Sequence, residues 1–541
     1  MCHVEPPCSR IRPCRAGRLS LLEQRVGELQ LGGTVPGMPL WRTMTDHPSE
    51  REAKFEVPDD FEMPFLGDPI ERSSVKLSAR YWDTADHRLL RWGRTLRYRE
   101  ASDGSEDGWT LKVGAPPGAP ASGAVLDRRE LDEPGSSDEP PARLAALVLG
   151  TVRGAPLRPV ATLETDRELV RLGAGKEGGS ATVEVSDDRV SSAVDGSPGP
   201  SFRQIEVEAK GPGAGPFLAQ LSDRLIRAGA KATTATKLET VLGGRPEPEV
   251  VVPRLRSMSR VDVLVRYALA RSVIRLIGED PKIRASSDAD PVHDARVATR
   301  RLRSDLKSLE PYLAPVEGLR TELGWVGRLL GAVRDLDVLI GRMDARIREL
   351  DGPDREAAAP ILARLEDDRH RRRTELLDGL GSDRYLDLLD ELIEASRRPP
   401  VADPTDDRRA RRVLRTVTRK AWRRTARAVD RLDPEPPDVA LHEIRKRAKR
   451  ARYVAELGRE VFGKPAMRLA DRLADVQDGF GELQDTVVAE ERLRSLHLPS
   501  GSAFVAGMLV CSERSARAEA RVRWRRLWKA ASAKRVRRWL A

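Results

Sequence analysis

The segment Glu50-Arg51-Glu52-Ala53-Lys54 decides the predicted fold, because Glu206-Val207-Glu208-Ala209-Lys210 repeats its pattern E-x-E-x-K. Successive side chains of a β-strand point to opposite faces, so the two glutamates and the lysine of each segment share one face. Charges at this density are costly to bury unless other groups pair with them. A divalent metal together with a polyanion would satisfy both signs. We interpret the two segments as parts of one such site; the alternative is two solvated strand faces.

Strand-like segments alternate with turns rich in glycine and proline from residue 50 to about 245, which predicts an antiparallel all-β or α+β domain. The predicted strands include residues 76–81, 95–100, 109–113, 128–131, 161–165, 181–185 and 203–210. Helical patterns at residues 143–152 and 216–228 interrupt them. Arg97 and Arg99 alternate with apolar neighbours, as does Lys112. A nearly closed sheet with its apolar side chains outward would have a charged interior, which a bound polyanion would stabilise.

Length and composition narrow the class of protein. The chain has 541 residues and a formal net charge of +11, which predicts two or more domains and partners that are phosphates, nucleic acid or acidic surfaces. Cys2, Cys8 and Cys14 lie at the very start and only Cys511 lies elsewhere, so we expect a reducing cytoplasm and no disulfide framework. No apolar segment reaches the roughly 18 residues that cross a bilayer, which predicts a cytoplasmic protein without a membrane partner.

Six motifs between residues 48 and 243 resemble the CYTH domain, the triphosphate tunnel metalloenzyme family. They are E-x-E-x-K at residues 50–54, Tyr81-Trp82-Asp83-Thr84, Leu96-Arg97-Tyr98-Arg99, Leu111-Lys112, Glu206-x-Glu208-x-Lys210 and Lys237-Leu238. The resemblance implies an α+β antiparallel eight-stranded β-tunnel. It also implies that arginine and lysine bind a triphosphate and that glutamate binds a divalent metal, Mg²⁺ or Mn²⁺.

The resemblance assigns roles residue by residue. The metal ligands would be Glu50, Glu52, Glu206 and Glu208. The substrate-binding residues would be Lys54, Arg97, Arg99, Lys112, Arg167, Lys210 and Lys237, and the catalytic residues Glu50, Glu52 and Lys54. One segment departs from the family: relatives often carry R-T-R-R where this chain has Glu164-Thr165-Asp166-Arg167. The loss of two cations would weaken substrate binding, shift specificity or end catalysis.

From residue 257 onward the pattern is helical and strongly charged, and it contains an internal repeat. Residues 293–303 are echoed by residues 442–452, and residues 330–335 by residues 480–485. On a helix, spacings of three and four gather basic side chains into one stripe opposite an apolar face. The predicted apolar face comprises Ala295, Ala298, Leu302, Leu306 and Leu309 in the first copy and Ile444, Ala448, Ala451 and Ala455 in the second. The stripe of the first copy is His293, Arg296, Arg300, Arg303 and Lys307, and that of the second is His442, Arg445, Lys449 and Arg452. Like charges at this spacing repel, so we expect a linear polyanion along both stripes; the alternative is a pair of solvated surface helices.

This second half, residues 257–535, resembles the CHAD domain, a helical domain with basic residues and histidines that often follows CYTH. The resemblance implies an all-α helical-bundle domain with an internal two-fold repeat, and binding of inorganic polyphosphate. The final stretch, residues 513–540, is predicted to be a basic helix with Trp524, Trp528 and Trp539. It would either cap the bundle or extend the basic surface.

The predicted organisation has four parts. Residues 1–43 would be a disordered extension or lie ahead of a start at Met44, and it is open whether they are translated. Residues 44–243 would form the tunnel domain, residues 244–256 a linker and residues 257–541 the helical domain. The two repeats of the helical domain would span about residues 257–350 and 405–500. The predicted function is metal-dependent hydrolysis of inorganic triphosphate or polyphosphate, with polyphosphate held by the helical domain. The alternative is a non-catalytic polyphosphate-binding or granule-targeting protein.

Substrate and partner choices stay open within this prediction. The sequence lacks a Walker-type glycine-rich loop, which disfavours a P-loop mechanism. Thiamine triphosphate and ATP remain alternative substrates, and the oligomeric state is open. Nucleic acid is a disfavoured partner, because the few aromatic residues are not interleaved with basic ones. We expect a cytoplasmic location, with association with polyphosphate granules as a further expectation.

Overall fold

The computed structural model describes residues 45–114, 125–173, 181–211 and 213–540. The side chains of residues 45–50 and 125–129 lie outside this description, so Glu50 is placed only by its backbone. The predicted extension, residues 1–43, also lies outside it. None of the described helices is both long and apolar enough to cross a membrane.

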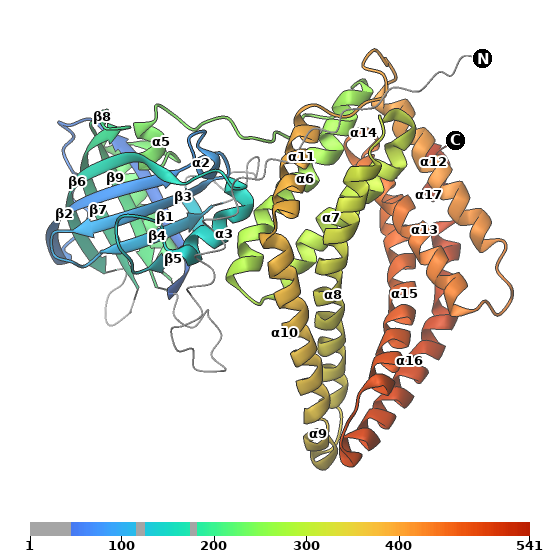
Figure 1. Ribbon diagram of the computed structural model, residues 1–541. Coiled ribbons are helices and arrows are strands. Elements are labelled where there is room, and N and C mark those ends of the chain that lie inside the picture. The colour runs from blue at the N-terminus through green and yellow to red at the C-terminus, as the bar shows by residue number, and fades with distance from the viewer. Residues whose placement is uncertain (1–44, 115–124, 174–180, 212, 541) are drawn as a thin grey trace, which may run out of the picture. The chain divides into compact units, whose positions relative to one another are not determined.

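The first described region is an antiparallel sheet with short helices (Figure 1). Its strands are β1 (Thr45–Val57), β2 (Pro69–Asp83), β3 (Arg94–Ala101), β4 (Gly108–Val113), β5 (Val125–Glu133), β6 (Arg158–Gly173), β7 (Thr182–Val194), β8 (Ser197–Pro198), β9 (Phe202–Lys210) and β10 (Lys231–Thr233). The strand order is β10-β1-β5-β4-β3-β2-β6-β7-β8, and β9 pairs with both β1 and β7. The antiparallel sheet predicted from the sequence is confirmed.

Four helices accompany the sheet: α2 (Arg88–Arg91), α3 (Ala142–Val152), α4 (Gly215–Arg227) and α5 (Lys237–Val241). The apolar residues of β1, β7 and β9 alternate with charged ones and pack against α4, as Phe55, Val185 and Leu221 illustrate. The opposite face of these strands is therefore the charged face, as the period of two requires. The helix α5 packs through Leu238 and Val241 against β2 and β6.

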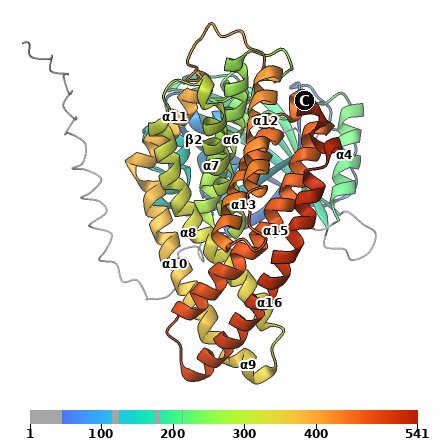
Figure 2. The ribbon, with the colours of Figure 1, turned by 90° about the vertical axis from the view of Figure 1, so that its right-hand side faces the viewer.

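The second described region is helical (Figures 1 and 2). Its helices are α6 (Val261–Ala285), α7 (Ala289–Leu309), α8 (Glu317–Ile347), α9 (Gly352–Ala357), α10 (Ala359–Gly381), α11 (Asp383–Arg397), α12 (Ala410–Val429), α13 (Asp438–Leu457), α14 (Arg459–Phe462), α15 (Lys464–Ser495), α16 (Ser500–Ala531) and α17 (Lys534–Arg537), with 3₁₀ turns η2 (Glu310–Tyr312) and η3 (Arg538–Leu540). The helix α7 packs between α6 and α8, and α13 packs between α12 and α15, so the two halves repeat one arrangement. The predicted all-helical region is confirmed.

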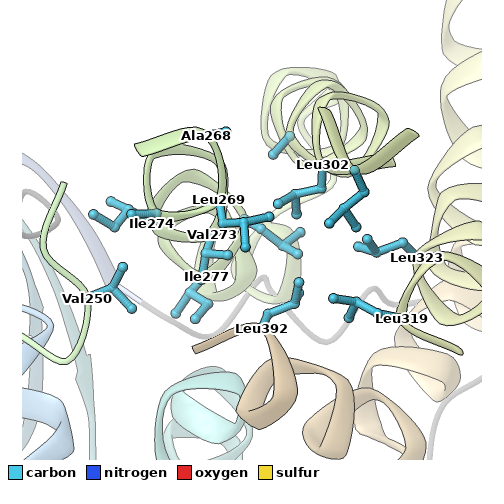
Figure 3. Close-up of a cluster of buried hydrophobic side chains, with 14 of the residues drawn as sticks. Val250, Ala268, Leu269, Val273, Ile274, Ile277, Leu302, Leu319, Leu323 and Leu392 are labelled. Carbon is cyan, nitrogen blue, oxygen red and sulfur yellow. The ribbon is translucent and has the colours of Figure 1, made fainter. Parts of the chain in front are cut away.

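Each half has its own apolar core. The first gathers side chains of α6, α7, α8 and α11, among them Leu269, Leu302 and Leu392 (Figure 3). The second gathers side chains of α12, α13, α15 and α16. The residues predicted to face the core opposite the basic stripes are all buried: Ala295, Ala298, Leu302, Leu306, Leu309, Ile444, Ala448, Ala451 and Ala455. Burial of this face directs the stripes away from the core.

The three tryptophans near the C-terminal end cap the second core. Trp524 contacts Phe480 with ring centroids 5.4 Å apart, and Trp528 stacks on Trp422 at 5.2 Å. Trp539 contacts a phenylalanine of α14 at 4.5 Å. Aromatic pairs at these distances add to the stability of a core beyond the area that they bury. Of the two alternatives for this stretch, the structure therefore supports the cap.

The segment expected to be a linker, residues 244–256, is buried at three positions, Glu249, Val250 and Leu255. Glu249 is buried and accepts hydrogen bonds from the guanidinium of Arg153 at 2.7 and 2.9 Å. It also accepts one from the indole N–H of Trp92 at 2.6 Å. A buried carboxylate held in this way would be costly to release, so the segment is not freely solvated at this position.

Candidate functional site

Three carboxylates and three cations meet on the charged face of the sheet: Asp188, Glu206 and Glu52 with Lys237, Lys54 and Arg167. The Lys237 Nζ atom lies 2.8 Å from Asp188 Oδ2 and 3.0 Å from Glu206 Oε1. Lys54 pairs with Glu206 and lies 2.9 Å from Glu52 Oε2. Lys237 reaches this point because a capping box, in which the side chains of residues 236 and 239 bond each other's backbone, fixes the first turn of α5. Five strands and helices thus contribute to one cluster.

Arg167 on β6 completes the pairing of this cluster. Its Nε and Nη2 atoms donate to the two oxygens of Asp188 at 2.8 and 2.9 Å. Burial would raise the pKa of Asp188, but Lys237 and Arg167 outweigh it and lower that pKa. Burial opposes ionisation of Glu206 in the same way, and Lys237, Lys54 and Arg167 together hold its pKa well below the usual range. Both carboxylates are therefore ionised at neutral pH.

Arg97 and Arg99 on β3 add positive charge that the carboxylates do not fully balance. Arg99 pairs with Glu106, which Arg167 also approaches at 3.4 Å. The Nε atoms of Arg97 and Arg99 are buried and have no hydrogen-bond partner in the described part of the chain. Burial and the neighbouring Arg97 and Arg167 cations lower the pKa of Arg99 to about 9. A cation in such surroundings lacks compensating negative charge, so the cluster suits an anion with several oxygen acceptors.

Tyr81 on β2 reports the same excess of positive charge. It is buried, which by itself raises the pKa of a phenol. The cations of Arg97, Lys237 and Arg99 outweigh burial and lower the pKa of Tyr81 below its ordinary value. The positive potential therefore extends from β3 across β2 to α5.

Two of the glutamates expected to bind metal, Glu52 and Glu208, lie side by side on this face. Glu52 on β1 is directly opposite Glu208 on β9, which is directly opposite Glu184 on β7. Residues opposite each other on antiparallel strands have Cβ atoms about 5 Å apart. The two nearby lysines already take part in pairing: Lys54 with Glu52, and Lys210 with Glu208. Within the described residues, no three Asp, Glu, His or Cys side chains converge closely enough to hold a metal by themselves.

This donor set still fits Mg²⁺ or Mn²⁺ in kind. Both ions prefer oxygen ligands, and Mg²⁺ is usually held by one or two carboxylates together with substrate phosphates rather than by an all-protein cage. Glu52 and Glu208 are opposite each other and half-buried or buried, which matches that mode. Glu206 is more fully engaged, because it pairs with both Lys54 and Lys237.

The acidic residues of segment 164–167, which departs from the family pattern R-T-R-R, do not face this site. Glu164 and Asp166 are exposed, and they contact Ser78 at 2.7 Å and Lys76 at 3.3 Å on the outer face of β2. Arg167 points to the other face of β6 from these two residues and belongs to the charged face. This placement corrects the expectation that the segment removes two cations from the site, since neither position points into it.

The remaining predicted sheet residues are placed as follows. Lys112 on β4 pairs with Glu130 on β5. Lys210 lies at the end of β9 and also approaches Glu184 at 3.8 Å. Sequence reasoning missed Asp188, which balances two of the predicted cations. The sequence offers only a weak signal for it: Glu184 lies between Val183 and Val185, and Asp188 has the same parity four residues later, between Asp187 and Arg189.

The two basic stripes of α7 and α13 come together around Arg300. Burial lowers the pKa of Arg300, and so do the nearby cations of Arg296, Arg445 and Arg452. The Nε atoms of Arg300 and Arg445 are buried and have no hydrogen-bond partner among the described residues. Glycines leave room for two stripe residues, since Gly331 lies beside Arg296 and Gly481 beside Arg445.

The stripes are not uniform along their length. Lys307, predicted as the last member of the first stripe, pairs instead with Glu310 at 2.9 Å. Arg296 pairs with Asp335 at 2.9 Å, and Arg452 with Glu456 at 3.3 Å. Lys449 is half-buried and Arg303 is exposed.

The two predicted histidines occupy equivalent places at the start of the stripes. Burial lowers the pKa of His293, with a further contribution from Arg334. Burial likewise lowers the pKa of His442, with contributions from Lys446 and Arg445. Both imidazoles are therefore mainly neutral at pH 7 and able to take up a proton beside an anion.

Comparisons with known proteins agree with this description. Two family models match the chain, the CYTH domain at residues 49–221 and the CHAD domain at residues 267–494. Two uncharacterized proteins of Mycobacterium tuberculosis, MT2285 and Rv2226, are each 33% identical over 511 residues, which cover 86% of this chain and 92% of the relative.

Solved structures match parts of the chain. The structure of PptA from Streptomyces chartreusis has a TM-score of 0.43 at 20% identity and covers 50% of this chain and 100% of that chain. The CHAD domain of the plant Ricinus communis has a TM-score of 0.41 at 21% identity and covers 54% and 95%. An adenylyl cyclase-like protein of Hippeastrum with a dominant triphosphatase activity has a TM-score of 0.25 at 15% identity and covers 37% and 98%. On the family models and the full-length relatives, the chain belongs to the family of proteins that join a CYTH domain to a CHAD domain.

Proposed function

We propose that this protein hydrolyses inorganic triphosphate or polyphosphate with Mg²⁺ or Mn²⁺ at the charged face of the sheet, and that the helical region binds polyphosphate. The CYTH family includes triphosphatases and cyclases, and it generally uses divalent metal ions. The observation that carries the proposal is the cluster of Arg97, Arg99, Arg167 and Lys237, in which the buried Nε donors of Arg97 and Arg99 lack a partner in the described chain.

The cations would hold the phosphate chain and neutralise charge at the bond that breaks. Arg97 and Arg99 offer buried donors toward the phosphate oxygens, which become more negative in the transition state. Arg167 and Lys237 are fixed by Asp188, so they require little reorganisation when substrate binds. Glu52 and Glu208 would hold the metal ion together with phosphate oxygens. The bound ion would supply Lewis-acid activation of the phosphoanhydride and of the attacking water.

The helical region would hold longer chains. The two stripes converge around Arg300 and leave cations with buried, unpartnered Nε atoms in the described structure. A linear polyanion laid along both stripes would relieve the repulsion among these cations and release counterions. Its affinity is therefore expected to fall steeply with salt concentration.

A substrate panel tests the proposal. Tripolyphosphate, long-chain polyphosphate, thiamine triphosphate and ATP would each be incubated with the full chain and Mg²⁺ or Mn²⁺, with a chelator as the control. We expect metal-dependent release of orthophosphate from tripolyphosphate or polyphosphate. Turnover of thiamine triphosphate or ATP without turnover of the inorganic substrates would contradict the proposed substrate class.

The second candidate is a non-catalytic polyphosphate-binding protein. It draws support from the lysines that already pair with Glu52, Glu206 and Glu208, because a lysine in that position competes with a metal ion. It predicts tight binding of polyphosphate with no release of orthophosphate under any metal condition. The same panel therefore separates the two candidates.

A further inference from the structure

A cavity of about 590 Å³ lies between the end of α7, the turn η2 and the helices α12 and α13. Its wall carries six cations: Lys307, Lys420, Arg424, Lys446, Arg447 and Arg450. Only Glu310 and Glu443 supply negative charge to it. Hydroxyl groups of Ser308, Tyr312 and Thr416 also line it, so it offers both charge and hydrogen bonding to a ligand.

Most of these cations have no acidic partner. Lys307 is paired with Glu310 at 2.9 Å, and Lys446 with Glu443 at 2.8 Å. The other four, Lys420, Arg424, Arg447 and Arg450, form no ion pair within the described residues. The Ser308 Oγ atom is buried and has no hydrogen-bond partner there. The pKa of Arg450 is lowered by burial, and by Arg424, Arg447 and Arg320, which is a further sign of uncompensated positive charge.

The cavity does not belong to the stripe face of α13. His442, Arg445, Lys449 and Arg452 form the stripe, whereas Lys446, Arg447 and Arg450 lie between them in sequence. At about 100° per residue, Arg447 and Arg450 fall on another side of the helix, while Lys446 borders the stripe beside His442. A ligand along the stripe would therefore not occupy this cavity.

The internal repeat supplies a comparison. The match of His293 with His442 sets the correspondence between the two halves. With the same separation in sequence, the first-half counterparts of Lys420, Arg424 and Arg450 are Arg271, Arg275 and Arg301. Each first-half arginine has an acid: Arg271 lies 3.5 Å from Asp305, Arg275 lies 2.9 Å from Asp294, and Arg301 pairs with Glu456. In the first half this surface is neutralised.

Two of these acids, Asp305 and Glu456, have no acidic counterpart in the other half. The second-half counterpart of Asp305 is Val454, and the first-half counterpart of Glu456 is Lys307. The counterpart of Asp294 is Glu443, which is bonded to Lys446 instead. Lys420, Arg424 and Arg450 thus stand where paired arginines stand in the first half, but without the ion pairs of that half, which leaves positive charge for an anion.

We propose that this cavity binds a compact anion with several adjacent phosphate groups, such as a triphosphate, at a site separate from the charged sheet and lined by only one predicted stripe residue, Lys307. Four unpaired cations match the charge of a triphosphate chain, and the arginines can bind its oxygens in a bidentate manner. The volume admits such a group with or without a small organic part. The proposal concerns binding alone and does not depend on hydrolysis at the sheet.

Hydrogen exchange measured by mass spectrometry tests this site locally. The full chain would be titrated with tripolyphosphate, ATP or long-chain polyphosphate, all with a chelator and no metal. We expect tripolyphosphate to slow exchange in peptides that cover residues 416–424 and 443–450. The double variant Arg424→Gln with Arg447→Gln should weaken this protection at least about tenfold, because it removes two charged hydrogen-bond donors. Both side chains are exposed, so folding should be retained.

The matched control is Arg275→Gln with Arg472→Gln, which makes the same change in net charge at two exposed, paired arginines. It should leave the protection unchanged. Protection by ATP as well as by tripolyphosphate would show that the triphosphate group itself is bound, and protection by tripolyphosphate alone that the ligand is inorganic; both agree with the proposal. Protection by long-chain polyphosphate only, protection that survives in the double variant, or protection confined to residues 293–303 and the strands would overturn it.

Discussion

Asp188 holds together the most highly charged part of the sheet. It is fully buried, and its two oxygens accept from Arg167 while one lies 2.8 Å from Lys237. A single buried carboxylate therefore fixes two cations that would otherwise repel each other. The sequence predicted both cations, since each follows a family motif or an alternating strand. It did not predict Asp188, because the pairing joins β6, β7 and α5 across residues far apart in the chain.

The substitution Asp188→Asn is expected to lower the free energy of unfolding by about 3–5 kcal/mol, because it removes the bidentate partner of Arg167 and one of the two carboxylates that pair with Lys237. Urea unfolding of the full chain, followed by tryptophan fluorescence, would measure the loss. Asp195→Asn is the control, since Asp195 pairs with Arg158 at 3.1 Å on the exposed surface and should cost about 1 kcal/mol or less. Equal losses in the two variants would remove the assigned role of Asp188.

Arg97, unlike Asp188, is expected to contribute to ligand binding and not to stability. Its buried Nε atom has no partner in the described chain, so Arg97→Gln should change stability by less than about 1 kcal/mol while lowering affinity for tripolyphosphate at least about tenfold. Calorimetric titration and thermal unfolding would measure the two quantities. Arg80→Gln, at an exposed position of β2, should change neither. Unaltered affinity in Arg97→Gln would place the phosphate elsewhere.

At the scale of single elements, the helix α7 illustrates what a sequence pattern can and cannot predict. The spacing of its apolar residues placed Leu302 and Leu306 in the core correctly. The same spacing grouped Lys307 with the stripe, but η2 begins three residues later and supplies Glu310 as its partner. Periodicity describes a helix surface, whereas the partner of a side chain at the helix end depends on the next turn of the chain.

The two stripe histidines are expected to make polyphosphate binding depend on pH. Their pKa values are lowered in the free protein, and a bound polyanion would raise them, so binding takes up protons. Affinity for long-chain polyphosphate should therefore increase several-fold as the pH falls from about 7.5 to 5.5. The variant His293→Gln with His442→Gln should lose this dependence.

Fluorescence anisotropy with labelled polyphosphate at constant ionic strength would give the pH profile. The control is His370→Gln, because His370 is exposed on α10 and lies outside both stripes. It should keep the profile of the wild-type chain. A double variant with an unchanged profile would exclude the histidines as the source of the pH dependence.

At the scale of the whole chain, the change from a period of two to a period of 3.6 residues predicted a sheet region followed by a helical region, and both are confirmed. The repeated basic stripes also followed from sequence. The cavity beside α12 did not, because its wall combines α7, η2, α12 and α13, and such a juxtaposition leaves no local pattern. The exposed placement of Glu164 and Asp166 required the strand register as well.

Orthophosphate release from tripolyphosphate by two matched variants tests the central claim most directly. Glu52→Gln with Glu208→Gln alters the proposed metal ligands, whereas Glu164→Gln with Asp166→Asn removes two carboxylates from the exposed face of β6. With Mg²⁺ or Mn²⁺, we predict that the first variant loses activity by about 100-fold or more and that the second stays within about twofold of wild type. Wild-type activity in the first variant, or an equal loss in both, would contradict hydrolysis at the charged face of the sheet.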